Sequence, residues 1–118
     1  MTTPKAIETE TQFKDVTDAK ALEELFALSH SQPVVLFKHS VTCPISTAAY
    51  QQMSRCGGSV SLIIVQSARD ISRRIETKTG VRHESPQAII LRNGQAAWSA
   101  SHWNVTTDAV KNALSQQQ

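Results

Sequence analysis

Short apolar stretches recur along this chain and alternate with segments whose apolar residues are spaced three and four apart. The stretches at 34–37, 60–65 and 87–91 predict buried strands, because a strand covered on both faces carries few polar positions. The segments between them predict amphipathic helices. This alternation favours an α/β sandwich with a mixed sheet. No apolar run exceeds four residues, far below the roughly 20 that cross a bilayer, so no membrane span is expected.

Turn and cap residues set the expected boundaries of these elements. Thr17 and Asp18 are suitable helix caps, Pro33 stops any continuation of that helix, and Pro44 suits the first position of the next one. In the first half of the chain we expect a short edge strand at 13–16, a helix from 18 to about 29, a strand at 34–37 with Lys38 and His39 at its end, and a helix from 43 to 56 that Gly57-Gly58 ends. A strand at 60–65 and a helix at 69–79 that stops at Gly80 follow. The chain then forms strands at 87–91 and 95–99, joined by Asn93-Gly94, and a helix capped by Thr106 or Thr107 that runs to Leu114. Residues 1–12 are expected to form a loose N-terminal tail, which leaves 13–118 as one domain.

The charge of the chain bears on its partners. A net charge of +2 is too small a surplus for the basic face that phosphate neutralisation requires, so nucleic acid is not an expected partner. Residues 1–31 carry three Lys and six carboxylates, and residues 32–118 carry nine basic and four acidic groups, so the later part should favour acidic ligands mildly. The first residues lack an apolar stretch behind a basic start. We therefore expect no secretory signal and a cytoplasmic protein.

Cys43 occupies the connection between a predicted strand and a predicted helix. A cysteine at a helix N-terminus faces unpaired amide hydrogens and the positive end of the helix dipole, which stabilise the thiolate and lower its pKa. A structural cysteine that happens to begin a helix is the alternative, but it would favour apolar neighbours, and Thr42 and Ser46 flank Cys43. Because the thiolate is the attacking species in disulfide exchange, Cys43 is the candidate nucleophile.

Cys56 is expected to be core filler. If one helix ran from Cys43 to Cys56, their separation would be roughly 20 Å at about 1.5 Å per residue, whereas a disulfide needs a Cα separation of about 4 to 7 Å. The position three residues after the first cysteine, where a dithiol oxidoreductase would carry the second, is Ser46. The chemistry expected is therefore that of one thiol. Two cysteines are also too few for a multi-Cys zinc site, and no metal is expected.

Four segments, taken in order, closely resemble the bacilliredoxin-like family of YtxJ type. The segments are Phe37-Lys38-His39-Ser40, Thr42-Cys43-Pro44-Ile45-Ser46, Glu84-Ser85-Pro86-Gln87 and Ser101-His102-Trp103-Asn104. The similarity runs from about Phe13 to Leu114. It implies a thioredoxin-like three-layer sandwich whose mixed sheet of four to five strands carries helices on both faces. It also implies a monothiol enzyme that removes bacillithiol from mixed disulfides on cytosolic proteins.

The resemblance gives Pro86 a role. In thioredoxin-like proteins a cis-proline precedes the strand that faces the nucleophile, and Ser85-Pro86 introduces the strand expected at 87–91. The peptide groups around Ser85 would then be free to bond an extended ligand beside Cys43. A trans-proline that merely begins an edge strand is the alternative.

Histidines and a tryptophan complete the candidate site. His39 lies four residues before Cys43 and could assist its ionisation, or could be a satisfied structural group. By similarity to glutaredoxins, the corner at His102, Trp103, Asn104 and Thr106 could hold the carboxylate end of a thiol ligand, while Trp103 could instead pack the last helix onto the sheet. Arg82 and His83 flank the proline turn and offer cationic groups for the same carboxylates.

The expected function is thus a thiol-disulfide oxidoreductase in which Cys43, supported by Pro44, Ser46, Thr42 and His39, attacks the bacillithiol sulfur of S-thiolated client proteins. No bound cofactor is expected, and the low-molecular-weight thiol is a co-substrate. Two alternatives stay open: a glutaredoxin-like enzyme that uses glutathione, and a non-catalytic redox sensor or binding module capped at Cys43. An iron–sulfur role is disfavoured, because Pro44-Ile45-Ser46 replaces the Gly-Phe-Ser of cluster-binding relatives.

Overall fold

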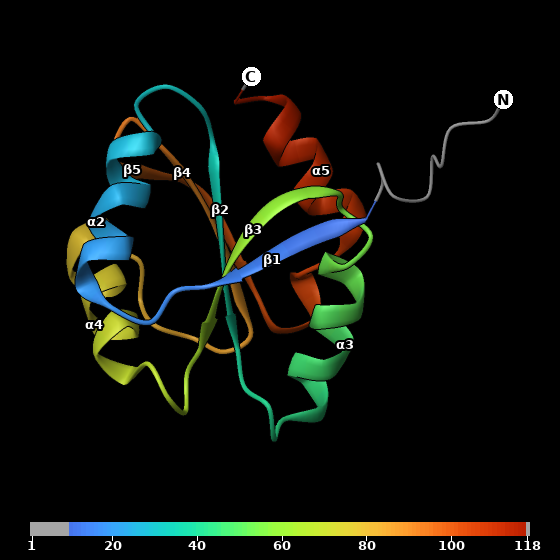
Figure 1. Ribbon diagram of the computed structural model, residues 1–118. Helices are drawn as coiled ribbons and strands as arrows, with labels where there is room; N and C mark the ends of the chain where they lie inside the picture. The colour runs from blue at the N-terminus through green and yellow to red at the C-terminus, as the bar shows by residue number, and fades with distance from the viewer. Residues whose placement is uncertain (1–9, 118) are drawn as a thin grey trace, which may run out of the picture.

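The computed structural model describes residues 10–117, which form five strands and four α-helices in the expected order (Figure 1). In chain order the elements are β1 (Thr11–Asp15), α2 (Ala19–Leu28), β2 (Val34–His39), α3 (Pro44–Met53), β3 (Gly58–Ile64), α4 (Arg69–Thr79), β4 (Gln87–Arg92), β5 (Gln95–Ser101), the short 3-10 helix η1 (His102–Asn104) and α5 (Thr107–Ser115). The caps follow the sequence closely. Asp18 accepts from the Ala21 amide, Thr106 caps α5, and Gly80 ends α4 in the left-handed conformation.

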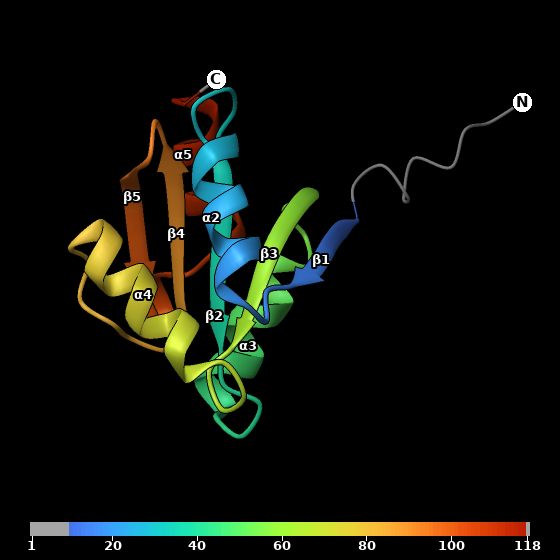
Figure 2. The same ribbon diagram turned by 60° about the vertical axis from the view of Figure 1, so that its left-hand side comes forward.

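The five strands form one mixed sheet in the order β1-β3-β2-β4-β5. The pairs β1/β3 and β3/β2 are parallel, whereas β2/β4 and β4/β5 are antiparallel. Helices α2 and α4 cover one face of the sheet and α3 and α5 cover the other (Figure 2). The expected three-layer sandwich with helices on both faces is therefore observed.

The sheet separates two apolar cores, and β2 contributes to both because successive side chains of a strand point to opposite faces. Leu36 packs with Phe26 and Ile75 on the side of α2 and α4. Phe37 packs with Met53 and the residues of α5 on the opposite side. The same alternation places Lys38 on the α2 and α4 side and His39 on the α3 side, which matters for the site.

The N-terminal boundary differs from the prediction. Strand β1 begins at Thr11, inside the expected loose tail, and ends one residue before Val16. The reason is a long-range contact: the Thr11 hydroxyl donates to the Met53 carbonyl at 2.6 Å and accepts from the Gly57 amide at 3.0 Å. Residues 1–9 of that tail lie outside the described part of the chain.

The second helix is shorter than predicted. It ends at Met53, and Cys56 lies in the turn that follows rather than on the apolar stripe of the helix. The chain must reverse at this point to place β3 between β1 and β2, and Gly57 and Gly58 take φ values of 77° and 72° to do so. The strands at 34–37, 87–91 and 95–99 also extend further, to His39, Arg92 and Ser101.

The topology brings four connections to one edge of the sheet. Strand β2 ends at His39 and β3 at Ile64, while β4, which is antiparallel to β2, begins beside them at Gln87, and β5 returns to the same edge at Ser101. Cys43, Gln66, Pro86 and His102 lie just beyond these strand ends. No helix within residues 10–117 is long and apolar enough to cross a membrane.

Candidate active site

Cys43 is the N-cap residue of α3, and Pro44 occupies the first turn, as predicted. Its thiol is partly exposed and not in a disulfide. The side chain makes no cap hydrogen bond, so the amides at the helix start remain available to a negative charge. The Ser46 amide lowers the pKa of Cys43 most, the Ile45 amide and the Ser46 hydroxyl act in the same direction, and burial opposes them. The net direction is towards the thiolate, the nucleophilic form.

Ser46 connects the start of α3 to the end of β2. Its side chain is fully buried, and its hydroxyl oxygen accepts from the Ser40 amide at 3.2 Å. An oxygen that accepts in this way still has its own hydrogen to donate, and Cys43 lies one helical turn before it. The residue in the place of the second cysteine of a dithiol enzyme therefore has a hydroxyl free to donate to a Cys43 thiolate, and this hydroxyl lowers the pKa of Cys43.

Gln66, which the sequence analysis did not single out, secures the loop that carries Cys43. Its amide nitrogen donates to the Ser40 hydroxyl at 2.7 Å and to the Thr42 hydroxyl at 3.2 Å, and its amide oxygen accepts from the Val41 backbone at 3.3 Å. Thr42 therefore serves in the loop as a partner of Gln66. No local pattern indicates this contact, because Gln66 is 24 residues or more away in sequence.

The segment before β4 lies at the same edge of the sheet. The Ser85–Pro86 peptide bond is cis, and the Pro86 carbonyl accepts from the His102 amide at 2.9 Å. The Ser85 hydroxyl is buried and has no partner among the described residues. His102 adopts a φ of 55°, and its ring lies 3.2 Å from the Glu84 carboxylate. Ser85, Pro86 and His102 thus form one connected group.

His39 lies in an aromatic cluster on the α3 side. Its ring centroid is 5.7 Å from that of Phe37 and 5.1 Å from that of Tyr50. Nδ1 is buried without a hydrogen-bond partner within residues 10–117. Burial lowers the pKa of His39 below its ordinary value, more than the Ser46 backbone raises it. A neutral imidazole that packs at a tilt against two aromatic rings favours the structural interpretation over proton transfer at Cys43.

The corner after β5 is only partly as expected. Trp103 is 69% exposed, so the alternative that it packs α5 onto the sheet is wrong, and its ring is accessible to a ligand. Asn104 is exposed as well. The Thr106 hydroxyl already accepts from the Ala109 amide, and the Thr107 hydroxyl donates to the Gln52 carbonyl at 2.7 Å. The tie between α5 and α3 comes from Thr107 rather than from Trp103.

Cys56 is at the other end of α3 from Cys43. It is partly buried against the α3 and α5 core, and its sulfur lies 3.8 Å from the Gln52 carbonyl. Burial raises the pKa of Cys56, against the opposing charge of Lys111. The expected role as core filler agrees with this environment, although the residue follows the helix instead of lying on it.

Lys38 is a second feature that sequence reasoning missed. Its side chain is fully buried on the α2 and α4 side, with Nζ 3.0 Å from His83 Nδ1 and 3.5 Å from the Ser72 carbonyl. Burial lowers the pKa of Lys38 to about 8, while Glu76 opposes the change. Burial first and then the Lys38 charge lower the pKa of His83, against Glu76 and Glu84. His83 is therefore not a free cation, and Arg82 is exposed.

Comparison with known proteins decides the family. A model of the monothiol bacilliredoxin BrxC family matches residues 14–110. The chain belongs to the monothiol bacilliredoxin family. A solved structure described as a candidate oxidoreductase with a thioredoxin fold is 32% identical, with a TM-score of 0.79 over 86% of this chain and 92% of that one. The predicted resemblance is confirmed.

More distant structures agree with the bacilliredoxin fold. Thioredoxin from Trypanosoma brucei brucei is 13% identical, covers 89% of each chain and has a TM-score of 0.71. Thioredoxin from Fasciola hepatica is 9% identical, with a TM-score of 0.70 over 89% of this chain and 99% of that one. At such identities the likeness shows the fold alone. Together, family and fold support a thiol oxidoreductase role for this bacilliredoxin-family chain. Within residues 10–117, no three His, Cys, Asp or Glu side chains gather as metal ligands would.

Proposed function

We propose that this protein is a monothiol thiol-disulfide oxidoreductase that removes bacillithiol from mixed disulfides on cytoplasmic proteins, with Cys43 as the nucleophile. One observation carries the proposal: Cys43 begins α3 with a lowered pKa, while Cys56 lies at the far end of that helix with a raised pKa. The family to which the chain belongs supports the choice of thiol. Trp103 and the Ser85-Pro86 segment, at the same edge of the sheet as Cys43, are the proposed contacts for the substrate.

Two thiolate displacements complete the proposed reaction. In the first, the Cys43 thiolate attacks the bacillithiol sulfur of the client mixed disulfide, a Cys43–bacillithiol disulfide forms, and the client cysteine leaves as a thiolate that takes up a proton. In the second, a bacillithiol thiolate attacks the bacillithiol sulfur on Cys43, which forms bacillithiol disulfide and regenerates the Cys43 thiolate. Each step exchanges one S–S bond for another, and no resident cofactor is needed.

The test is to incubate the reduced protein with one client carrying either bacillithiol or glutathione, with the same free thiol present, and to follow the client by mass spectrometry. We expect release of bacillithiol by the native protein and by Cys56→Ser, and none by Cys43→Ser. Preferential release of glutathione would favour a glutaredoxin-like enzyme. Formation of a stable Cys43 mixed disulfide without turnover would favour a redox sensor. If Cys56→Ser stalls at that mixed disulfide, the one-thiol mechanism is wrong.

A further inference from the structure

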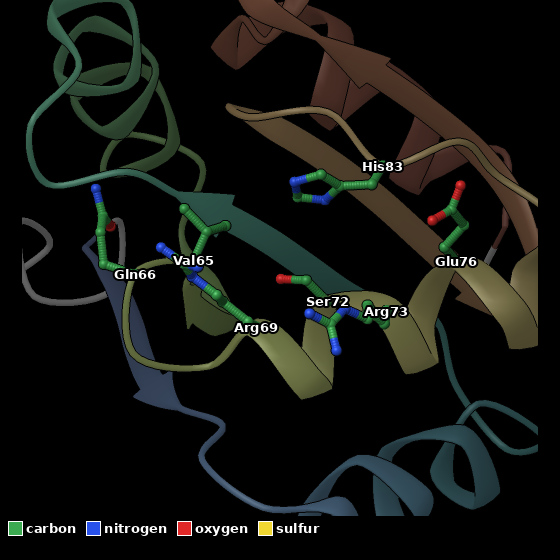
Figure 3. A pocket seen from close by; sticks show the side chains of 7 residues that line it. All are labelled: Val65, Gln66, Arg69, Ser72, Arg73, Glu76 and His83. Carbon is green, nitrogen blue, oxygen red and sulfur yellow. The ribbon is translucent and has the colours of Figure 1, made fainter.

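A hollow of about 410 Å³ opens beside α4, on the side of the sheet opposite α3 (Figure 3). It lies between the end of β3, helix α4 and the segment that leads to Pro86. Gln66 lies at one end, and His83 and Glu76 lie at the other. This volume is within the range of sites that hold small molecules. The disulfide chemistry proposed above does not use it.

Two unpaired guanidinium groups line the hollow. Arg69 and Arg73 are both exposed, and neither has a carboxylate within 4.0 Å in the part of the chain that the structure describes. Arg74, the next residue on the same helix, instead pairs with Asp70 at 2.8 Å. Guanidinium groups bind carboxylates through paired, charge-assisted hydrogen bonds. The hollow therefore presents free donors of the kind that a carboxylate requires.

Ser72 is an independent sign of a missing partner. Its side chain is 5% exposed, and its hydroxyl has no hydrogen-bond partner among residues 10–117. In Figure 3 that hydroxyl points into the hollow, between the two arginines and His83. A buried polar group without a partner is costly. A ligand oxygen at this position would satisfy it.

His83, which lines the hollow, and Lys38, which contacts it, add donors. An ammonium group can only donate, so the 3.0 Å contact makes His83 Nδ1 the acceptor and places the ring hydrogen on Nε2, a further donor on a residue that lines the hollow. The Lys38 charge is itself buried behind Ser72. An anion in the hollow would offset this charge, and Glu76 at the far end is the opposing group.

The hollow is joined to the active-site loop. Gln66 lines the hollow and also donates to Thr42, the residue before Cys43, at 3.2 Å. A ligand that spans Gln66 therefore lies next to the loop that carries the nucleophile. The lining also carries both signs of charge: Arg69 lies towards Gln66, Arg73 lies in the middle, and Glu76 lies at the other end. This suits a small molecule with a carboxylate and an amine better than a polyanion.

We propose that the hollow binds the carboxylate end of the low-molecular-weight thiol while its sulfur is joined to Cys43. Arg69, Arg73 and the Ser72 hydroxyl hold the carboxylate, and Gln66 lies between it and the Cys43 loop. The proposal rests on the function proposed above and makes it more specific: the enzyme selects thiols that carry carboxylates. Arg69 and Arg73 are positioning residues, because they touch the thiol away from the reacting sulfur.

Binding is tested without the disulfide chemistry. Isotope-labelled Cys43→Ser protein is titrated with S-methylbacillithiol and with S-methylglutathione, which keep their carboxylates and cannot form a disulfide. We expect amide shifts at Arg69, Ser72 and Gln66. The double change Arg69→Ala and Arg73→Ala should weaken binding about tenfold or more, since it removes charge-assisted bonds. Arg74→Ala, which removes the same charge from the same helix outside the hollow, should bind as the parent does.

Turnover gives the second readout. One client is loaded with bacillithiol, with glutathione or with 2-mercaptoethanol, which has no carboxylate. The double arginine variant should release bacillithiol at least several-fold more slowly than the native protein, through a raised KM. It should release 2-mercaptoethanol at the native rate. Arg74→Ala should match the native protein on every client. Both arginines are exposed, so folding should be kept, and circular dichroism checks it.

The two proposals fail in different ways. If the native protein releases no thiol from any client, the proposed function is wrong, whether or not the titration shows binding. If the native protein turns over but the double variant is equally fast on all clients and no shifts occur around Ser72, the carboxylate site is wrong and the function stands. Equal slowing on carboxylated and uncharged conjugates would also overturn the site, because the arginines would then act on the fold or on Cys43.

Discussion

Replacing Lys38 with methionine should stabilise the protein at neutral pH and remove a pH dependence of stability. The Lys38 side chain is fully buried, and its pKa falls from 10.5 to about 8 on folding. Between these values the unfolded chain binds more protons than the folded one, so stability rises as the pH goes from about 8 to 10.5. Below pH 8 the full cost of burying the charge is present.

The size of the effect follows from this difference. At about 1.36 kcal/mol per pH unit, the interval between 10.5 and about 8 gives an upper limit of about 3 kcal/mol. Methionine also leaves the Ser72 carbonyl and His83 Nδ1 without their Lys38 donor, which offsets part of the gain and reduces it to roughly 1–2 kcal/mol. Methionine retains the packing of the lysine stem. A variant without the charge should also lose affinity for a carboxylate in the hollow.

The assay is urea unfolding of Lys38→Met and of the native protein under reducing conditions at pH 7, 8.5 and 10, followed by circular dichroism. Groups away from Lys38 affect both proteins equally. The Lys38 charge also acts on His83, but an imidazole is neutral at pH 8.5 and 10, so the difference in unfolding free energy between these two values isolates Lys38. The difference between the two proteins should be largest at pH 7 and approach zero at pH 10. Lys20→Met, which removes an exposed lysine, is the control. A variant that is less stable at every pH by a constant amount would refute the reasoning.

Two further predictions concern the two thiols and the Thr107 hydroxyl. Cys43 should react with iodoacetamide at lower pH than Cys56, because helix amides lower the pKa of Cys43 and burial raises the pKa of Cys56. Peptide mapping after alkylation at several pH values measures the reaction of each thiol, and coincident pH profiles would contradict the prediction. Thr107→Val should lower the unfolding free energy by about 1 kcal/mol, since it removes the hydroxyl that donates to the Gln52 carbonyl at 2.7 Å. Thr77→Val, at an exposed position on α4, should change the unfolding midpoint in urea little, and an equal loss in both variants would mean that the Thr107 bond contributes nothing.

The parts of this molecule that local chemistry determines were predictable from sequence. Helix α4 has the predicted bounds, because Gly80 provides the left-handed residue that ends it. Cys43 is at the predicted N-cap, because Pro44 can occupy only the first turn of a helix. These features depend on residues within one or two turns of each other.

The parts that were missed depend on contacts between distant segments. Lys38 looks like the polar end of a strand, and only the packing of α4 and His83 over it makes it a buried charge. Gln66 has no motif, yet its bonds span 24 to 26 residues. Where helix α3 ends, the Met53 carbonyl accepts from the Thr11 hydroxyl, which is 42 positions away in the sequence. Propensity cannot anticipate such contacts.

Ser46 occupies the position of the second cysteine of a dithiol enzyme. Removing its hydroxyl shows whether this residue supports the Cys43 thiolate. Ser46→Ala keeps the amides of Ile45 and Ser46 and removes only the hydroxyl, so the pKa of Cys43 should rise from its lowered value while remaining below the ordinary one. The alkylation profile of Cys43 should then move to higher pH with its plateau rate unchanged. Removal of the hydroxyl also leaves the Ser40 amide without its 3.2 Å acceptor, which should cost about 1 kcal/mol of stability.

Thr47→Ala is the matched control, because its hydroxyl bonds to the Cys43 carbonyl rather than acting on the sulfur. It should leave the alkylation profile of Cys43 in place. If Ser46→Ala leaves the profile in place as well, the hydroxyl contributes nothing to the thiolate, and the helix amides alone activate Cys43. A profile that shifts in Ser46→Ala only would mean that the serine in the second-cysteine position supports the thiolate directly, as a site built for one sulfur requires.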